Sequence, residues 1–309
     1  MTLEPGDFTL RLSAVRNRAV GLMVVSLMQA MRCVELTRLA NIGAGIMRIL
    51  GPRLHEHHVA CANLVAAFPE KSTAEIERIA LGMWDNIGRL AAEYVHLDRL
   101  WAHDPAHKQA ECVEADQGSA DRLLRLRDDG KPALIFFGHL ANFELIGIIG
   151  SRFGCDLGFV YRQQHIAAIG NMIDKLRTRS MPTLTHAIRS GLGAGREIEQ
   201  ALKRGAHVGV LIDQHVIEGI EVNFFGRRCK ISPMLAKLAR RIECPIHGAR
   251  VIRLPGHRFR CELTEAIEVP RDLRGRIDVH ATMQAITSIM EGWVREYPDQ
   301  WIWAHQRWR

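Results

Sequence analysis

Residues Lys131-Pro-Ala-Leu-Ile-Phe-Phe-Gly-His-Leu-Ala-Asn-Phe-Glu144 give the clearest indication of the fold class of this chain. Residues 133–137 are apolar without interruption, which is the pattern of a strand buried on both faces of a parallel sheet. Gly138 ends this run, and a helical pattern begins at about residue 142. We therefore predict a strand, a tight turn and a helix. In open α/β sheets, ligands bind beyond the carboxyl ends of the strands, where this turn lies.

Outward from this stretch, strand-like runs alternate with helical segments. The predicted strands are residues 133–137, 157–161, 208–212, 246–251 and 258–263, and the predicted helices lie near 119–129, 142–151, 166–180, 194–204, 232–242 and 279–296. Such alternation predicts an α/β fold with a mostly parallel central sheet flanked by helices. No internal repeat or long linker interrupts the pattern.

The N-terminal part of the chain is expected to be a helical extension. Residues 19–31 are almost wholly apolar, but the run is shorter than the ~20 residues that a helix needs to cross a bilayer. Apolar residues of 32–50 recur with helical spacing. Two interpretations are open, a pair of core helices or a helix that lies in a membrane interface. We divide the chain into a helical membrane-associating segment, 1–56, and a main domain, 57–309.

Further along, Pro69 breaks the helical pattern, and Ser72 with Glu75 forms the signature of a capping box. We therefore expect an amphipathic helix to begin just after Ser72. At the other end of the chain, tryptophans lie among arginines, a composition that suits either a membrane interface or packing into the core. They are Trp293, Trp301, Trp303 and Trp308, among Arg295, Arg307 and Arg309.

Composition narrows the class of partner. The chain has 41 Lys and Arg against 34 Asp and Glu, and the net charge of +7 favours an anionic partner such as a lipid headgroup, a phosphate-bearing substrate or a nucleic acid. The chain has three tyrosines and no recognisable nucleic-acid motif, so we expect no nucleic-acid partner.

Neither a disulfide framework nor a metal site is expected. The seven cysteines are odd in number and form no Cys-x-x-Cys pair. The run His55-Glu56-His57-His58 is rich in ligand types, but adjacent helical residues point in different directions. We interpret it as a solvated helix surface rather than a metal site.

His139 and Glu144 are the candidate chemical groups. Residues five apart on a continuous helix do not face each other, so the two meet only if His139 lies in the turn and Glu144 in the first helical turn. Gly138 permits an unusual backbone angle there, and Asn142 is a plausible helix cap. We predict that Glu144 accepts a hydrogen bond from one imidazole nitrogen, which raises the basicity of the other. Such a base suits removal of a proton from a hydroxyl that attacks an acyl thioester.

Two features of the sequence bear on the interpretation of His139 as a base. No Gly-x-Ser-x-Gly elbow or activated cysteine accompanies the pair, which favours direct transfer over a covalent acyl-enzyme. A His-x-x-x-x-Glu string alone is a weak signal in a chain with 15 histidines, and a structural histidine at a strand end is an equal alternative.

A set of blocks in a fixed order carries a resemblance. These blocks are Ala60-Cys-Ala-Asn-Leu-Val-Ala-Ala-Phe-Pro-Glu70, Gly138-His-Leu-Ala-Asn-Phe-Glu144, Val160-Tyr-Arg162, Asp213-Gln214, Val222-Asn-Phe-Phe-Gly226 and Gln300-Trp-Ile-Trp-Ala-His-Gln-Arg-Trp-Arg309. From about residue 40 to its C-terminus, the chain resembles the late acyltransferases of lipid A biosynthesis, of the lauroyl and myristoyl type. The resemblance implies a glycerolipid-acyltransferase-like fold and membership of lipopolysaccharide biosynthesis.

The resemblance also implies a reaction and its place. An acyl chain would pass from acyl carrier protein, or from coenzyme A, to a hydroxyl of a lipid A precursor, a glycolipid, at the cytoplasmic face of the bacterial inner membrane. The acyl carrier is a co-substrate, and no cofactor or metal is implied.

Residue by residue, His139 matches the catalytic histidine of the family and Glu144 its acidic partner. The expected substrate-binding residues are Arg162, Asp213, Gln214, Asn142 and Arg189. Arg162 is a candidate for binding the thioester oxyanion or an acceptor phosphate, and Arg189 for binding a phosphate or, as an equal alternative, for lying on a solvated basic surface. The chain departs from the family pattern at Ala141, where glycine is common, and at Phe143, where tryptophan is common.

Two other functions stay open. The acceptor is not readable from the sequence, so the chain could instead acylate another glycolipid or phospholipid, for example a phosphatidylinositol mannoside. A basic membrane-binding protein with no catalytic role is the alternative from a different class, and in that protein His139 would be dispensable.

Overall fold

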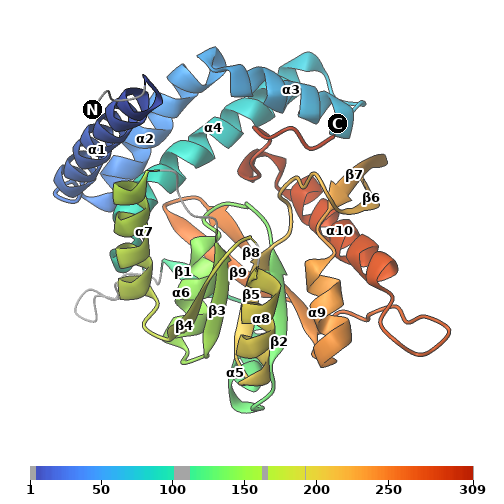
Figure 1. Cartoon of the computed structure of the whole chain (residues 1–309). Helices are drawn as coiled ribbons and strands as arrows, with labels where there is room; N and C mark the ends of the chain where they lie inside the picture. The colour runs from blue at the N-terminus through green and yellow to red at the C-terminus, as the bar shows by residue number, and fades with distance from the viewer. Residues whose placement is uncertain (1–4, 101–111, 162–165, 192, 309) are drawn as a thin grey trace.

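The computed structural model describes residues 5–100, 112–161, 166–191 and 193–308, with side chains from Arg18 onward within those ranges (Figure 1). Four N-terminal helices lie across one end of an α/β unit, above the central sheet in the view of Figure 1. The reaction site expected from the sequence falls between these two parts. Arg162 lies outside the described residues.

The sheet has seven strands in the order β1-β9-β8-β2-β5-β3-β4. Their bounds are β1 Val113–Ala115, β2 Ala133–Phe137, β3 Leu157–Tyr161, β4 Leu184–Arg189, β5 His207–Leu211, β8 Ile246–Leu254 and β9 Arg258–Leu263. From β8 to β4 every neighbouring pair is parallel, whereas β9 runs antiparallel to β8 and parallel to β1. The predicted fold class, a mostly parallel sheet in an α/β fold, is confirmed.

Helices cover both faces of the sheet. They are α5 Gln117–Asp128, α6 Glu144–Arg152, α7 Ala167–Ser180, α8 Ala194–Lys203, α9 Met234–Ile242 and α10 Val279–Glu296. Successive side chains of β2 point to opposite faces of the sheet, so they pack into two separate layers of the core. Leu134 and Phe136 pack with side chains of α8, α9 and α10, while Ile135 faces a cavity lined by α5 and α6. A sheet buried on both faces explains why residues 133–137 are continuously apolar.

The N-terminal layer consists of α1 Pro5–Met31, α2 Leu36–Leu50, α3 His55–Ala67 and α4 Thr73–Val95. The predicted capping box is confirmed, because Ser72 caps α4 and Glu75 bonds back to the Ser72 backbone. None of the described helices is long and apolar enough to span a membrane.

Helix α2 has two different apolar faces. Leu39, Ala40 and Ala44 are buried, and Gly43 meets Gly88 of α4 so closely that a Cβ on Gly88 would lie 2.2 Å from the Gly43 carbonyl oxygen. The opposite face exposes a row of large apolar side chains, Ile42, Ile46, Ile49 and Leu50. One face of α2 is thus part of the core, and the other is an exposed apolar surface.

Some elements were not predicted from the sequence. They are β1, β4 and a hairpin of β6 Ile220–Phe224 and β7 Arg227–Ile231. The hairpin turn, Phe225-Gly226, has positive φ at both positions, 54° and 70°, which fits the tight turns that join antiparallel strands.

Candidate active site

The loop after β2 presents His139 at the carboxyl end of the sheet. Gly138 is needed here for space, because a Cβ would lie 2.9 Å from Asp213 Oδ2. The unusual backbone angle occurs instead at Ala141, whose φ is +46°. This corrects the prediction for Gly138, and it gives a reason why glycine would fit at position 141.

The hydrogen-bond partner of His139 is Asp213, at the end of the neighbouring strand β5. His139 Nδ1 lies 2.8 Å from Asp213 Oδ1, and the His139 backbone N–H donates to Asp213 Oδ2 at 2.7 Å. The carboxylate can only accept, so Nδ1 carries the proton and the Nε2 lone pair of the neutral ring is left for the pocket. The predicted hydrogen bond from His139 to Glu144 is wrong, because the two strand ends place a different carboxylate beside the imidazole.

Asp213 and His139 each stabilise the charged form of the other. Burial opposes ionisation of Asp213, but the His139 charge and the hydrogen bonds from His139 and Trp301 outweigh it and lower the pKa of Asp213 to about 2. Burial also disfavours the imidazolium, yet the nearby charge of Asp213 raises the pKa of His139 above its usual value. An ionised Asp213 thus makes His139 a stronger base.

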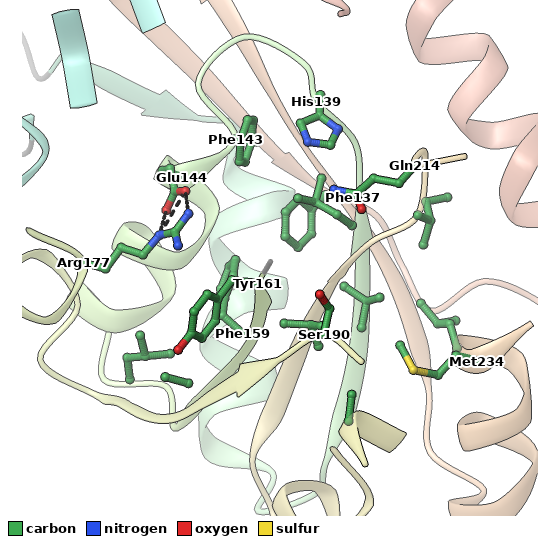
Figure 2. Close-up of a pocket in the computed structure, with 18 of the residues that line it drawn as sticks. Phe137, His139, Phe143, Glu144, Phe159, Tyr161, Arg177, Ser190, Gln214 and Met234 are labelled. Atoms are coloured by element: carbon green, nitrogen blue, oxygen red, sulfur yellow. Dashed lines mark hydrogen bonds and ion pairs between the residues drawn. The ribbon is translucent and has the colours of Figure 1, made fainter. Parts of the chain in front are cut away.

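Glu144 belongs to a second cluster in the same pocket. Its carboxylate accepts hydrogen bonds from Tyr94 and from Arg177, whose Nε lies 3.1 Å from Glu144 Oε2. Figure 2 shows Glu144 and Arg177 facing each other, with Phe143 between Glu144 and His139. The Glu144 side chain is only 3% exposed, against 22% for Arg177. Glu144 therefore holds the arginine at the pocket wall, and it influences His139 through its charge rather than through a hydrogen bond.

Asn142 does not cap α6, whose N-cap residue is Phe143 without a side-chain bond. The Asn142 side chain is fully buried and donates to Glu93 Oε2 at 2.9 Å. Glu93, itself fully buried, also binds Arg253. The predicted cap is thus wrong. Asn142 does not line the pocket, and its hydrogen bond to Glu93 joins the loop to α4 and, through Arg253, to β8.

The pocket that contains these groups has a volume of about 630 Å³ and opens at the carboxyl ends of β2, β3 and β5. Figure 2 shows its aromatic walls, with Phe137, Phe143 and Phe159 beside the polar groups. Further apolar lining comes from Val160, Met181, Leu184, Val210, Ile212, Met234 and Leu235. A mostly apolar pocket with a few fixed polar groups suits a ligand with a hydrocarbon chain and one reactive polar centre.

The other predicted substrate-binding residues lie at different places. Gln214 lines the pocket beside His139. Arg189 is exposed at the end of β4, where a hydrogen bond from its guanidinium to Tyr161 raises its pKa. Arg189 does not line the pocket, although the next residue, Ser190, does.

The C-terminal block closes over the loop. Trp301 Nε1 donates to Asp213 Oδ2 at 2.7 Å, and the Ala141 N–H donates to the Gln300 carbonyl at 3.0 Å. Trp301 and Trp303 are buried, so these two tryptophans belong to the core rather than to a membrane interface. Sequence reasoning missed Trp301 and Tyr94 as parts of the site.

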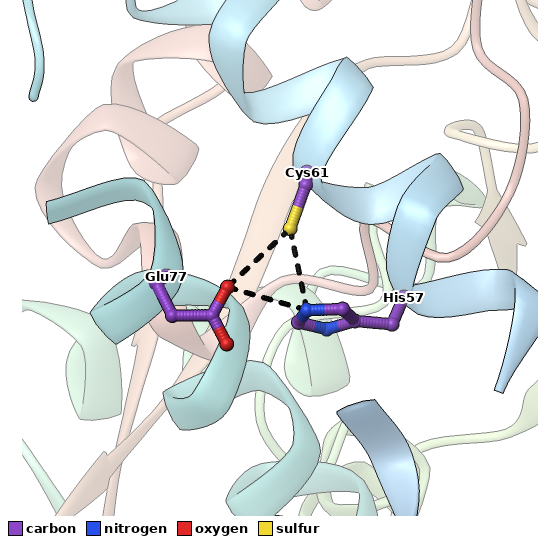
Figure 3. Close-up of side chains that lie close together, drawn as sticks. All are labelled: His57, Cys61 and Glu77. Atoms are coloured by element: carbon purple, nitrogen blue, oxygen red, sulfur yellow. Dashed lines mark hydrogen bonds and ion pairs between the residues drawn. The ribbon is translucent and has the colours of Figure 1, made fainter. Parts of the chain in front are cut away.

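Within the described residues, His57, Cys61 and Glu77 form a group with metal-ligand chemistry (Figure 3). His57 is buried, which corrects its assignment to a solvated surface. The Trp84 N–H donates to His57 Nδ1 at 3.2 Å, so the ring proton belongs on Nε2, which faces Glu77 Oε2 at 3.2 Å. Burial raises the pKa of Cys61 to about 11, which keeps its thiol protonated. The cluster is thus suited to joining α3 to α4 by hydrogen bonds.

Comparison of the chain with known protein families identifies the family to which it belongs. A family model described as bacterial lipid A biosynthesis acyltransferase matches residues 8–309, nearly the whole chain. No curated protein matches the chain. The match confirms the resemblance carried by the blocks from Ala60 to Arg309. The chain belongs to the bacterial lipid A biosynthesis acyltransferases, and it is accordingly an acyltransferase with a lipid A-type substrate.

Proposed function

We propose that the chain transfers a fatty acyl group from a thioester donor, acyl carrier protein or coenzyme A, to a hydroxyl of a lipid A precursor, with His139 as the general base. One observation carries the proposal. The His139–Asp213 pair lies at a pocket of about 630 Å³ whose walls are mostly apolar. A hydrocarbon chain fits such walls, and the pair supplies the base that a hydroxyl nucleophile requires.

The transfer follows from this geometry. Nε2 of His139 accepts the proton of the acceptor hydroxyl as its oxygen attacks the thioester carbonyl carbon. The new C–O bond forms, the tetrahedral intermediate collapses, and the C–S bond breaks. The imidazolium then gives its proton to the departing thiolate, so His139 returns to its neutral form. Asp213 acts as a positioning residue, because it holds the tautomer and stabilises the imidazolium.

Arg177 is the candidate for binding negative charge in this pocket. Its guanidinium is partly exposed there, and Glu144 fixes its orientation. A fixed guanidinium suits a phosphate of the acceptor or the developing oxyanion. Glu144 is in this account a positioning residue that acts through Arg177. Arg162 and Gln214 stay proposed substrate contacts, Gln214 because it lines the pocket next to His139.

Members of this family are membrane-associated. We place the membrane contact of this chain on α2, at the cytoplasmic face of the inner membrane, where its lipid acceptor would be met. The exposed row of Ile42, Ile46 and Ile49 is flanked by exposed arginines, Arg38, Arg48 and Arg53, which suit an anionic lipid surface.

The acceptor is tested by mass spectrometry of lipid A from cells with and without the gene. We expect one acyl chain to be missing without it, to return with the wild-type gene, and not to return with His139→Gln. An unchanged lipid A with a changed phospholipid or other glycolipid would overturn the acceptor and support the alternative. Full rescue by His139→Gln would overturn the role of the base.

A further inference from the structure

A second cavity, of about 600 Å³, lies between α8 and α9. It is an open groove on the surface, and its lining includes Ser232 and Met234 at the start of α9. The same two residues line the reaction pocket. The groove and the pocket therefore adjoin, and a flexible ligand that lies in the groove can extend into the pocket.

The groove is strongly basic. Arg196 and Lys203 lie seven residues apart on α8, and Lys237 and Arg241 lie four apart on α9, so each pair shares one helix face. One carboxylate, Glu199, lies among these four cations, so the lining carries a net charge of +3 (four minus one). All four cationic side chains are exposed.

Part of this charge is not neutralised within the protein. Glu199 binds both Lys203, at 2.7 Å, and Arg241, at 3.0 Å. Neither Arg196 nor Lys237 forms an ion pair in the part of the chain that the structure describes. Two cations sharing one acid and two without an acid leave a positive field along both edges of the groove.

The groove lies away from the proposed membrane contact. In Figure 1, α8 and α9 lie beside the sheet, whereas α1, α2 and α3 lie above it. A protein partner in the groove and a bilayer against α2 would thus approach different sides of the molecule, and neither would displace the other.

We propose that the groove between α8 and α9 is the docking surface for an acidic carrier protein that delivers the acyl chain as a thioester. The inference rests on the proposed function and adds to it the surface on which a carrier-protein donor docks. Charge complementarity selects an acidic partner, and the spread of four cations over two helices fits an extended protein surface better than the phosphates of one nucleotide. The flexible group that bears the acyl thioester on the carrier would pass Ser232 and Met234 and bring the thioester toward His139.

The test reverses the two unpaired charges in Arg196→Glu/Lys237→Glu. Transfer to a lipid A precursor is measured with two donors that carry the same acyl chain, acyl carrier protein and a small N-acetylcysteamine thioester. We expect KM for the carrier protein to rise about 10-fold or more with little change in kcat, because electrostatic steering is lost. Transfer from the small thioester should be unchanged, and the conservative variant Arg196→Lys/Lys237→Arg should behave as wild type.

Lys131→Glu/Arg274→Glu is the matched control, since it reverses two exposed cations outside the groove and should leave both donors unaffected. Equal KM for the carrier in wild type and in the groove variant would overturn the docking surface. So would an equal loss with both donors, or the same KM increase with acyl-coenzyme A. The proposed function has a separate readout, because wild type that transfers from neither donor would contradict it whatever the groove variant does.

Discussion

At the scale of single residues, the choice of partner for His139 decides how the site works. Asp213 holds Nδ1 and the backbone N–H of His139, and is itself held by Trp301. Glu144 is occupied by Tyr94 and Arg177. The two carboxylates therefore have separate tasks, one on the base and one on a cation, and their substitutions should have separable effects.

Asp213→Asn should lower kcat by about 10²-fold to 10⁴-fold, because the tautomer and the charge that stabilise His139 are weakened. The pH profile gives a more specific readout. Asp213 raises the pKa of His139, and the base works in its neutral form, so activity is lost as pH falls through that pKa. Without the Asp213 charge the pKa falls, and the acid limb of kcat/KM against pH should move to lower pH. If the acid limb of the profile does not move, Asp213 is not the group that raises the pKa of His139.

Glu144→Gln is the matched comparison, since Glu144 is a buried carboxylate of the same pocket. Its charge also raises the pKa of His139, but by less than that of Asp213. We expect a rise in KM for the acceptor as Arg177 loses its orientation, with a smaller shift of the acid limb than in Asp213→Asn. If the two variants shift the limb equally, the separation of tasks is wrong.

How far the sequence predicted the site depends on which contacts are local. The turn at Gly138 and the place of His139 follow from a short continuous pattern. The contact with Asp213 depends on β2 and β5 being neighbours in the sheet, although 74 residues separate the two side chains. Periodicity does not reveal strand order, so the sequence alone points to Glu144, the carboxylate nearest to His139 along the chain.

At the scale of elements, the strands with continuous apolar runs were predicted well, and 133–137 and 157–161 match β2 and β3. Strand β4 was missed because it is an edge strand and is mostly not buried. The adjacent polar residues Thr185 and His186 interrupt its apolar pattern. The short β1 was missed because three residues carry too little pattern. Edge and short strands owe their existence to tertiary pairing rather than to local sequence.

Gly88→Ala tests the contact between α2 and α4. A Cβ would lie 2.2 Å from the Gly43 carbonyl oxygen, so the helices must separate, at a cost of about 1–3 kcal/mol in the free energy of unfolding. Gly45→Ala on α2 is the control, because a Cβ there meets nothing within 4 Å and helix propensity should raise stability by about 1 kcal/mol. Denaturant unfolding measures both. Equal stability of the two variants would exclude this packing.

At the scale of the whole molecule, the site lies between a helical layer with an apolar outer face and a basic groove. Lipid acceptor and acyl donor would thus approach from different sides and meet at His139. The proposed division at residue 56 stays a prediction. The close packing of α2 on α4 indicates that the N-terminal layer also supports the loop, because Glu93 and Tyr94 belong to α4.

Ile42→Ser/Ile46→Ser should weaken binding to phosphatidylglycerol-containing vesicles by about 10-fold or more, since it removes two exposed apolar side chains of α2. Flotation with the vesicles measures the bound fraction. Ile217→Ser/Leu273→Ser removes two side chains that are more exposed but lie outside α2, and it should bind as wild type does. Equal losses in both double variants would show that general hydrophobicity, not α2, determines binding.

The role of His139 as the base is measured by the single-turnover rate of acyl transfer from acyl carrier protein to a lipid A precursor. Wild type and His139→Gln are compared at saturating donor and acceptor. We predict that wild type forms the new ester and that the variant does so about 10²-fold to 10⁴-fold more slowly, with unchanged acceptor binding. A His139→Gln rate equal to that of wild type would contradict the account.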